Sequence, residues 1–146
     1  MEIISHPGGA AVVALNDSGQ VCLLHQYRHV AGGYLWELPA GKIDDGEPPL
    51  TTARRELADE AGVLADDWQP LGDMLSSPGV FSEVVSLYLA RQLKTTDSNT
   101  DSDEVLEVHW VALDEALQWA ASGKIRDAKS VIGLFRAKTI VGKDET

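Results

Sequence analysis

Three carboxylates stand close together in the middle of the chain, at a spacing that could bind a metal ion. On an α-helix, Glu56, Asp59 and Glu60 would lie within an arc of about 100°. Like charges three and four residues apart repel one another on a helix, so the cluster costs stability unless a cation offsets it. Carboxylate oxygens are the ligands that Mg²⁺ and Ca²⁺ prefer. A solvated acidic surface, the ordinary reason for such a charge run, is the alternative interpretation.

These carboxylates need a helix to position them, and the sequence predicts one over Leu50–Ala61. Its apolar residues share one face, within an arc of about 80°: Leu50, Ala53, Leu57 and Ala61. The prolines before this segment suit a helix start, and Gly62 suits its C-terminal cap. Just upstream, the strand expected over 34–38 ends in a turn, whose backbone carbonyls could add neutral oxygen ligands. That mixture of carboxylate, carbonyl and water oxygens favours Mg²⁺.

The remaining pattern alternates strands and helices. Strands are expected over 10–15, 21–27, 34–38, 84–89 and 105–111, and further helices over 114–121 and 128–137. The turn signal at 16–19 predicts that the first two strands form a hairpin. Strands mixed with helices in this way indicate an α+β fold or a mixed-sheet sandwich.

The composition excludes several classes of protein. A chain of 146 residues has the length of one domain, and 12 basic against 23 acidic residues leave a formal charge of −11. This balance argues against binding to nucleic acid or to an anionic membrane, because both need basic surfaces. A single cysteine, Cys22, excludes an intrachain disulfide. No secretory signal and no apolar run of about 20 residues is visible. We therefore expect a cytoplasmic domain without nucleic-acid or membrane partners.

Residues 41–63 resemble the Nudix box, the loop-helix-loop signature of the Nudix hydrolases. The family pattern is G-x5-E-x7-R-E-U-x-E-E-x-G-U, where U is an apolar residue. The fixed positions match except that Asp59 stands where the pattern has the first of its paired glutamates. The resemblance extends over about 6–135 and implies one Nudix hydrolase domain over 1–146. It implies an α/β/α sandwich with a mixed β-sheet.

Segments outside the box are similar to ADP-ribose pyrophosphatases and related nucleotide-sugar hydrolases. They are 26–28 (QYR), 36–44 (WELPAGKID), 77–79 (SPG) with the glutamate at 83, and 103–110. The similarity implies a Mg²⁺-dependent pyrophosphohydrolase that cleaves a nucleoside diphosphate linked to another moiety, first of all ADP-ribose to AMP and ribose 5-phosphate. The alternatives are another nucleotide sugar or dinucleotide, or a non-catalytic sensor that binds a nucleotide sugar and regulates a partner. A homodimer is a possible assembly, although family members often dimerise through extra N-terminal strands, and about nine residues precede the first strand here.

The resemblance also implies roles for individual residues of the box. By similarity, Mg²⁺ (or Mn²⁺) would be bound by the Ala40 carbonyl, Glu56, Asp59 and Glu60. The shorter Asp59 is expected to hold its metal through a bridging water. Glu47 and Arg55 would join the loop to the helix by a salt bridge, a structural role that Gly41 and Gly62 share.

Substrate contacts are expected outside the box. Arg28 is the first candidate, because a guanidinium can bind phosphate oxygens through two hydrogen bonds; a surface arginine at a strand end is the alternative. Glu37 and Glu83 are further candidates for substrate binding. In similar enzymes a carboxylate on a distant loop orients the attacking water. Here the corresponding loop contains Glu104, the first candidate for this role, and Asp103 and Asp101, the next candidates. Glu60 is counted with them among the catalytic residues. The alternative interpretation of this loop is an ordinary solvated loop.

Overall fold

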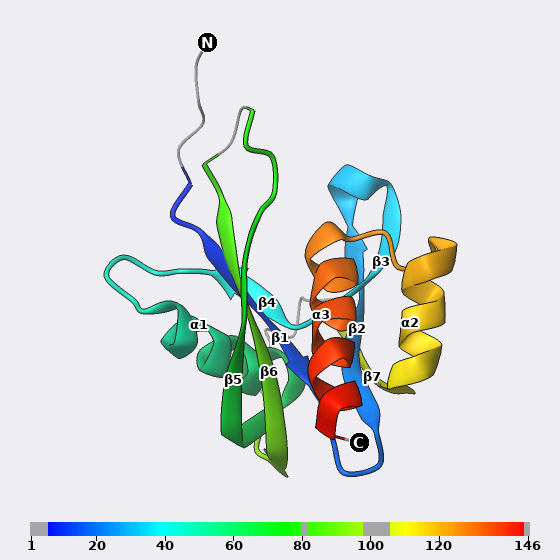
Figure 1. Cartoon of the computed structure of the whole chain (residues 1–146). Coiled ribbons are helices and arrows are strands. Elements are labelled where there is room, and N and C mark those ends of the chain that lie inside the picture. The colour runs from blue at the N-terminus through cyan, green and yellow to red at the C-terminus, as the bar shows by residue number, and fades with distance from the viewer. Residues whose placement is uncertain (1–5, 80–81, 98–105, 145–146) are drawn as a thin grey trace.

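Two β-sheets form the centre of the fold (Figure 1). The computed structural model describes residues 6–79, 82–97 and 106–144. The first sheet has the order β4 (Ala40–Lys42), β1 (Gly9–Ala14), β6 (Val84–Thr95), β5 (Val63–Leu75). The second has the order β3 (Gly33–Glu37), β2 (Gln20–Arg28), β7 (Leu106–Ala112). β1 and β6 pair in parallel and the other pairs are antiparallel, so the first sheet is mixed.

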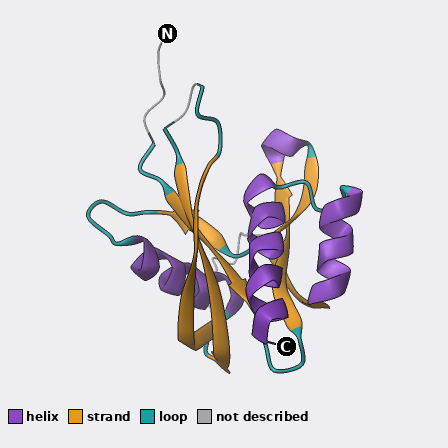
Figure 2. Cartoon of the chain, viewed as in Figure 1, coloured by secondary structure: helices purple, strands orange, loops and turns teal. Residues whose placement is uncertain are grey.

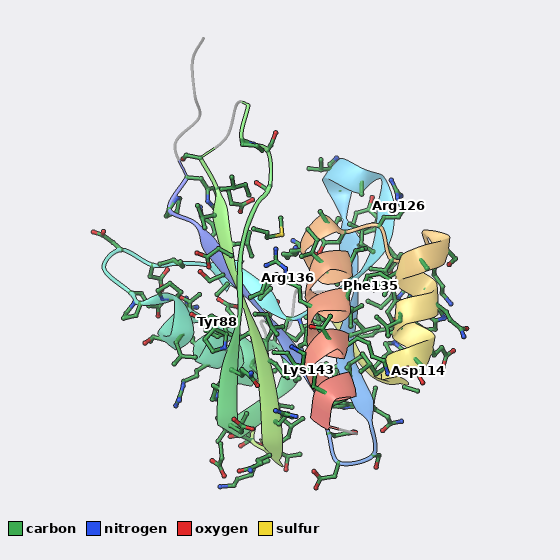
Figure 3. All side chains as sticks on the ribbon, viewed as in Figure 1. Tyr88, Asp114, Arg126, Phe135, Arg136 and Lys143 are labelled. Atoms are coloured by element: carbon green, nitrogen blue, oxygen red, sulfur yellow. The ribbon has the colours of Figure 1, made fainter. Side chains whose placement is uncertain are left out.

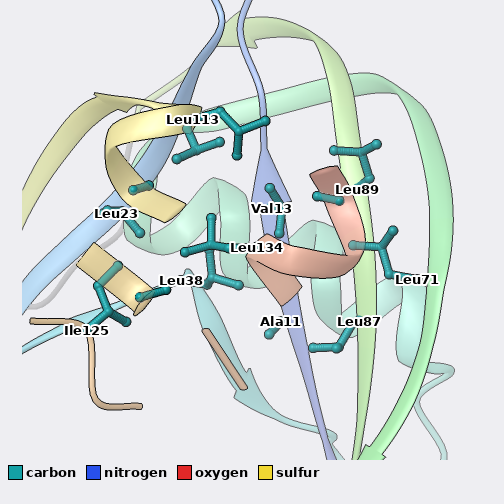
Figure 4. Close-up of a cluster of buried hydrophobic side chains, with 14 of the residues drawn as sticks. Ala11, Val13, Leu23, Leu38, Leu71, Leu87, Leu89, Leu113, Ile125 and Leu134 are labelled. Atoms are coloured by element: carbon teal, nitrogen blue, oxygen red, sulfur yellow. The ribbon is translucent and has the colours of Figure 1, made fainter. Parts of the chain in front are cut away.

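The alternation of side chains along β1 builds a hydrophobic core on each side of this strand. Ala11 and Val13 join a cluster that includes residues of α2 (Leu113–Ser122) and α3 (Ala128–Asp144), and Figure 4 shows them beside Leu134 of α3. Ala10 and Val12 point the other way, into a cluster with Ala53 of α1 (Pro49–Glu56). Helices therefore cover the strands on both sides (Figure 2), which confirms the expected mixed α/β sandwich.

The helix that carries the three carboxylates changes its pitch half-way. α1 runs from Pro49 to Glu56 and continues as one π-helical turn, η2, over Leu57–Ala61. Gly62 then ends the helix in the left-handed conformation, with φ of +68°, and its amide donates to the Ala58 carbonyl at 3.0 Å. The expected helix is present, but its last turn is wider than an α-helical turn. π-turns of this kind occur frequently at functional sites.

The expected hairpin between the first two strands is wrong. β1 and β2 belong to different sheets, and an isolated antiparallel bridge joins Leu15, just after β1, to Val21 of β2. The turn itself is present, because Asn16 Oδ1 accepts hydrogen bonds from the amides of Ser18 and Gln20 at 3.1 and 2.8 Å. The turn reverses the chain, but it does not make the two strands neighbours.

Three elements were not expected: the strand β4, where a turn was expected, the strand β5, and the short 3₁₀ helix η1 (His29–Ala31). β5 stands last in its sheet, and its pairing with β6 is irregular between Pro70 and Asp73. Arg136 of α3, labelled in Figure 3, holds this irregular stretch: its Nη1 donates to the carbonyls of Leu71 and Asp73 at 3.0 Å each. Within the described ranges, no helix combines the length and the hydropathy that crossing a bilayer requires.

Candidate active site

A cleft of about 460 Å³ brings together residues from both sheets and from the helices. Its volume suits a small-molecule ligand. The ionisable side chains that line it are Arg28, Lys42, Glu56, Glu60, Glu83, Asp127 and Lys129, and Ala40 and Gly41 line it with them. The candidates Arg28, Ala40, Glu56, Glu60 and Glu83 thus share one cleft, and Asp59 does not line it.

Glu47 and Arg55 form the ion pair that joins the loop to the helix. The guanidinium donates through Nε to Glu47 Oε2 at 3.1 Å and through Nη2 to Glu47 Oε1 at 2.9 Å. The Thr52 hydroxyl adds a bond of 2.6 Å and the Asp44 amide one of 3.2 Å to the same Oε1. The hydrogen bonds from Arg55 and then Thr52 lower the pKa of Glu47 to about 2. This network fixes the loop between β4 and α1 onto the helix.

Gly41 lies directly against the side chain of Glu56. A Cβ atom at position 41 would lie 2.6 Å from Glu56 Cγ, which is too close for any real contact. Arg55 also holds Glu56, because its Nη1 donates to Oε1 at 2.6 Å. The glycine at this position therefore leaves the space that the Glu56 side chain occupies.

Glu56 and Glu60 place carboxylate oxygen donors of α1 and η2 in the cleft. Glu60 Oε1 accepts a hydrogen bond from the Ala40 amide at 2.9 Å, which joins η2 to β4. Burial raises the pKa of Glu56, and the charges of Asp59 and Asp44 add to this against the opposing effect of Arg55. A nearby cation would favour the ionised form of such a carboxyl group.

These donors fit a divalent cation of the magnesium type. Among the described residues, no group of three His, Cys, Asp or Glu side chains is placed to enclose a metal ion. Mg²⁺ does not need such an enclosure, because it is usually bound through one or two carboxylates together with waters and substrate phosphates. Glu56 and Glu60 match that number and kind of ligand.

Arg28 is held by a buried carboxylate that does not itself line the cleft. Glu37 is 3% exposed and accepts from Arg28 Nε at 2.8 Å and from Nη2 at 3.3 Å. Lys129 of α3 donates to the same carboxylate at 3.1 Å. Burial alone would raise the pKa of Glu37, but Arg28 and Lys129 more than offset it and leave the pKa lowered. The structure thus places Glu37 beneath Arg28, where it fixes the guanidinium.

Two residues of this network, Asp127 and Lys129, were not among the expected site residues. Asp127 Oδ2 accepts from the Ser130 amide at 3.2 Å and from its hydroxyl at 2.6 Å, which caps the start of α3. A cap at Asp127 could have been inferred from the Asp-x-x-Ser spacing. No local signal marks Lys129, because its partner Glu37 is 92 residues away in the sequence.

Glu83 lines the cleft and lies close to His6. Its Oε2 lies 3.6 Å from Nε2 of His6, whose Nδ1 accepts a hydrogen bond from the Gly8 amide at 2.9 Å. Because Nδ1 is an acceptor, Nε2 carries the proton and faces Glu83. The loop carboxylates expected to orient the water, Glu104, Asp103 and Asp101, lie outside the described residues.

Comparison with known proteins identifies the family of this chain. A family model described as the NUDIX domain matches residues 5–132. The chain is 37% identical over 142 residues to an ADP-ribose pyrophosphatase of Mycobacterium tuberculosis, covering 95% of this chain and 69% of that protein. It is 36% identical to an ADP-ribose pyrophosphatase of Bacillus subtilis, and 37% identical to a methanol dehydrogenase activator of Bacillus methanolicus; each alignment covers 91% of this chain and 73% of the relative.

A solved structure shares the fold. The crystal structure of an ADP compounds hydrolase superposes with a TM-score of 0.85 at 23% identity, covering 94% of this chain and 74% of that one. The family model covers most of the chain, including the loop, helix and glycine whose contacts are described above. This chain therefore belongs to the Nudix family.

Proposed function

We propose that the protein is a Mg²⁺-dependent pyrophosphohydrolase that cleaves ADP-ribose to AMP and ribose 5-phosphate. The observation that carries this proposal is the composition of the cleft. Carboxylates of α1 and η2 and cations of β2 and α3 line the same cavity. A diphosphate needs both, because a carboxylate-bound metal and a guanidinium can share its negative charge. Two of the relatives described above are ADP-ribose pyrophosphatases, which supports the choice of substrate.

Glu56 and Glu60 would bind the metal directly, together with the Ala40 carbonyl, and Asp59 would act through a bridging water. When bound, the ion supplies Lewis-acid stabilisation of the phosphoryl oxygens and a water of lowered pKa. Mn²⁺ has the same ligand preferences and is the natural substitute. The Ala40 amide orients Glu60, and Arg55 orients Glu56, so both carboxylates are positioned before any ligand arrives.

Arg28 would bind the diphosphate, and Glu83 would contact the same substrate from the cleft wall. In the hydrolysis, a water oxygen bonds to one phosphorus while the bridging oxygen leaves with its electron pair and takes up a proton. The carboxylate that accepts the proton of the water is proposed to be Glu104, with Asp103 as the alternative. This assignment rests on the family resemblance alone.

A regulatory role is the second candidate, because one relative is named a methanol dehydrogenase activator. A panel of ADP-ribose, other nucleotide sugars, dinucleotides and nucleoside triphosphates, assayed with Mg²⁺ and with EDTA, separates the candidates. The proposal expects metal-dependent release of AMP and ribose 5-phosphate, with the highest kcat/KM for ADP-ribose. A higher value for another compound would correct the substrate. Tight binding of ADP-ribose by calorimetry without turnover would favour a sensor.

A further inference from the structure

Lys129 is a half-buried cation of the cleft with two carboxylate partners. Its Nζ lies 3.1 Å from Glu37 Oε1 and 3.0 Å from Asp127 Oδ1, and its side chain is only 22% exposed. Burial alone would lower the pKa of Lys129, but the charges of Asp127 and Glu37 more than offset it and raise the pKa. Lys129 is therefore charged at neutral pH.

The Glu37 carboxylate is shared between two cations. Arg28 occupies both of its oxygens, through Nε and Nη2, and Lys129 bonds to Oε1 as well. The third guanidinium nitrogen of Arg28, Nη1, makes no hydrogen bond within the described residues, and the side chain is 49% exposed on the cleft wall. Lys129 neutralises part of the negative charge of Glu37, so Arg28 does not have to compensate it alone. One nitrogen of Arg28 and much of its positive charge therefore remain available to a ligand.

Hydrogen bonds around Asp127 and Ser130 also fix the position of Lys129. Asp127, its second partner, is fixed by the amide and hydroxyl of Ser130. The Ser130 oxygen in turn accepts a hydrogen bond of 2.9 Å from the amide of Leu38, the residue after Glu37. The start of α3 and the end of β3 are therefore locked together, which sets the position of the ammonium group relative to Glu37.

We propose that Lys129 is a positioning residue for the substrate: by sharing the charge of Glu37, it leaves the Arg28 guanidinium oriented and available for the diphosphate. This inference rests on the proposed function. The formal charges of Arg28, Glu37, Asp127 and Lys129 sum to zero. Replacing Lys129 by an uncharged residue changes this sum to −1. The buried Glu37 then depends on Arg28 alone, so the guanidinium is drawn into charge compensation and its affinity for phosphate falls.

The test compares Lys129→Met, which keeps most of the length of the side chain but removes its charge, with two other variants. For Lys129→Met we expect KM for ADP-ribose to rise at least about tenfold while kcat changes less than about threefold. Lys129→Arg should restore most of the lost affinity, because it keeps a cation near Glu37. Lys138→Met is the matched control: Lys138 lies on the same helix and is also ion-paired, to Asp114 at 3.4 Å, but it does not line the cleft. Its KM should equal that of the wild type.

A double-mutant cycle with Glu37→Gln separates positioning from direct contact. If Lys129 acts through Glu37, Lys129→Met should change KM by less than about twofold once Glu37 is already Gln, because coupled residues are not additive. The same tenfold loss in both backgrounds would mean that Lys129 contacts the substrate itself, and would overturn the proposal. A wild-type KM in Lys129→Met would overturn it as well.

The design keeps this inference separate from the proposed function. Thermal denaturation of each variant checks that it is folded, and if Lys129→Met is not, Lys129→Gln replaces it in the cycle. If the wild type does not hydrolyse ADP-ribose, the proposed function fails. Calorimetric binding of ADP-ribose to the same variants then measures the affinities, and equal affinities for the wild type and the uncharged variant refute the role of Lys129.

Discussion

Replacing Gly41 by alanine should displace Glu56, the proposed metal ligand, without disturbing the fold. The new Cβ would lie 2.6 Å from Glu56 Cγ and nearer still to the carboxyl group, whereas ordinary contacts begin at 3.4 Å. The Glu56 side chain must therefore move by about 0.8 Å or more. Gly41 is not among the glycines with positive φ, so alanine fits the backbone itself. Mg²⁺ accepts only near-ideal octahedral geometry at about 2.0–2.1 Å, and a displacement of about 1 Å at a reacting site can cost about 10²-fold in rate.

We accordingly expect Gly41→Ala to lose about 10²-fold in kcat/KM, equivalent to about 2.7 kcal/mol of barrier. The Mg²⁺ concentration for half-maximal activity should rise, and Mn²⁺ binding by calorimetry without substrate should weaken. The free energy of unfolding should change by no more than about 1 kcal/mol. Gly142→Ala is the control, because a Cβ there meets nothing within 4 Å. If Gly41→Ala binds metal and turns over like this control, the proposal that Glu56 is a metal ligand is wrong.

Three further predictions concern the same segment. Glu60→Gln keeps the acceptor for the Ala40 amide but removes a charge, so activity should fall by about 10²-fold while the melting temperature stays equal or rises; activity within a fewfold of wild type would exclude Glu60 as a ligand. Because the pKa of Glu47 falls from 4.5 to about 2 on folding, its contribution to stability is complete above about pH 5 and disappears as the pH drops towards 2. Glu47→Gln should flatten this loss in urea titrations from pH 7 to pH 2, and an unchanged acid slope would contradict the assignment. Asp59→Glu should lower the Mg²⁺ needed for half-maximal activity at saturating substrate, and an unchanged requirement would show that position 59 does not limit metal affinity.

The part of the site that the sequence predicts well is the part whose determinants are local. The helix after Pro49, its end at Gly62 and the pairing of Glu47 with Arg55 all depend on residues within one short stretch. Periodicity and capping are properties of neighbouring residues, so they can be recognised without knowing the fold. The π-turn at the end of the helix could not be predicted in this way, because the apolar periodicity of this segment fits an ordinary α-helix.

The features that the sequence did not predict correctly depend on contacts between distant parts of the chain. Lys129 meets Glu37 only after α3 has docked on β3, and neither residue carries a signal of the other. β5 was missed because Pro70 and Gly72 normally interrupt strands, but a strand at the edge of a sheet tolerates them. The false hairpin after β1 has a related origin: the turn at Asn16 specifies a reversal of direction, whereas the pairing partner is set by the whole sheet.

The parallel pairing of β1 with β6 has a consequence for how the protein acquires its activity. Gly9 pairs with Val85, so most of the chain must be made before the central strand finds this neighbour. Non-local parallel pairings are slow to form, because the entropy of closing a long loop is lost before any contact compensates for it. During synthesis, the apolar strand Gly9–Ala14 leaves the ribosome long before β6 can cover its edge. The cleft that β1 helps to line is therefore completed late, once β6 has paired with β1.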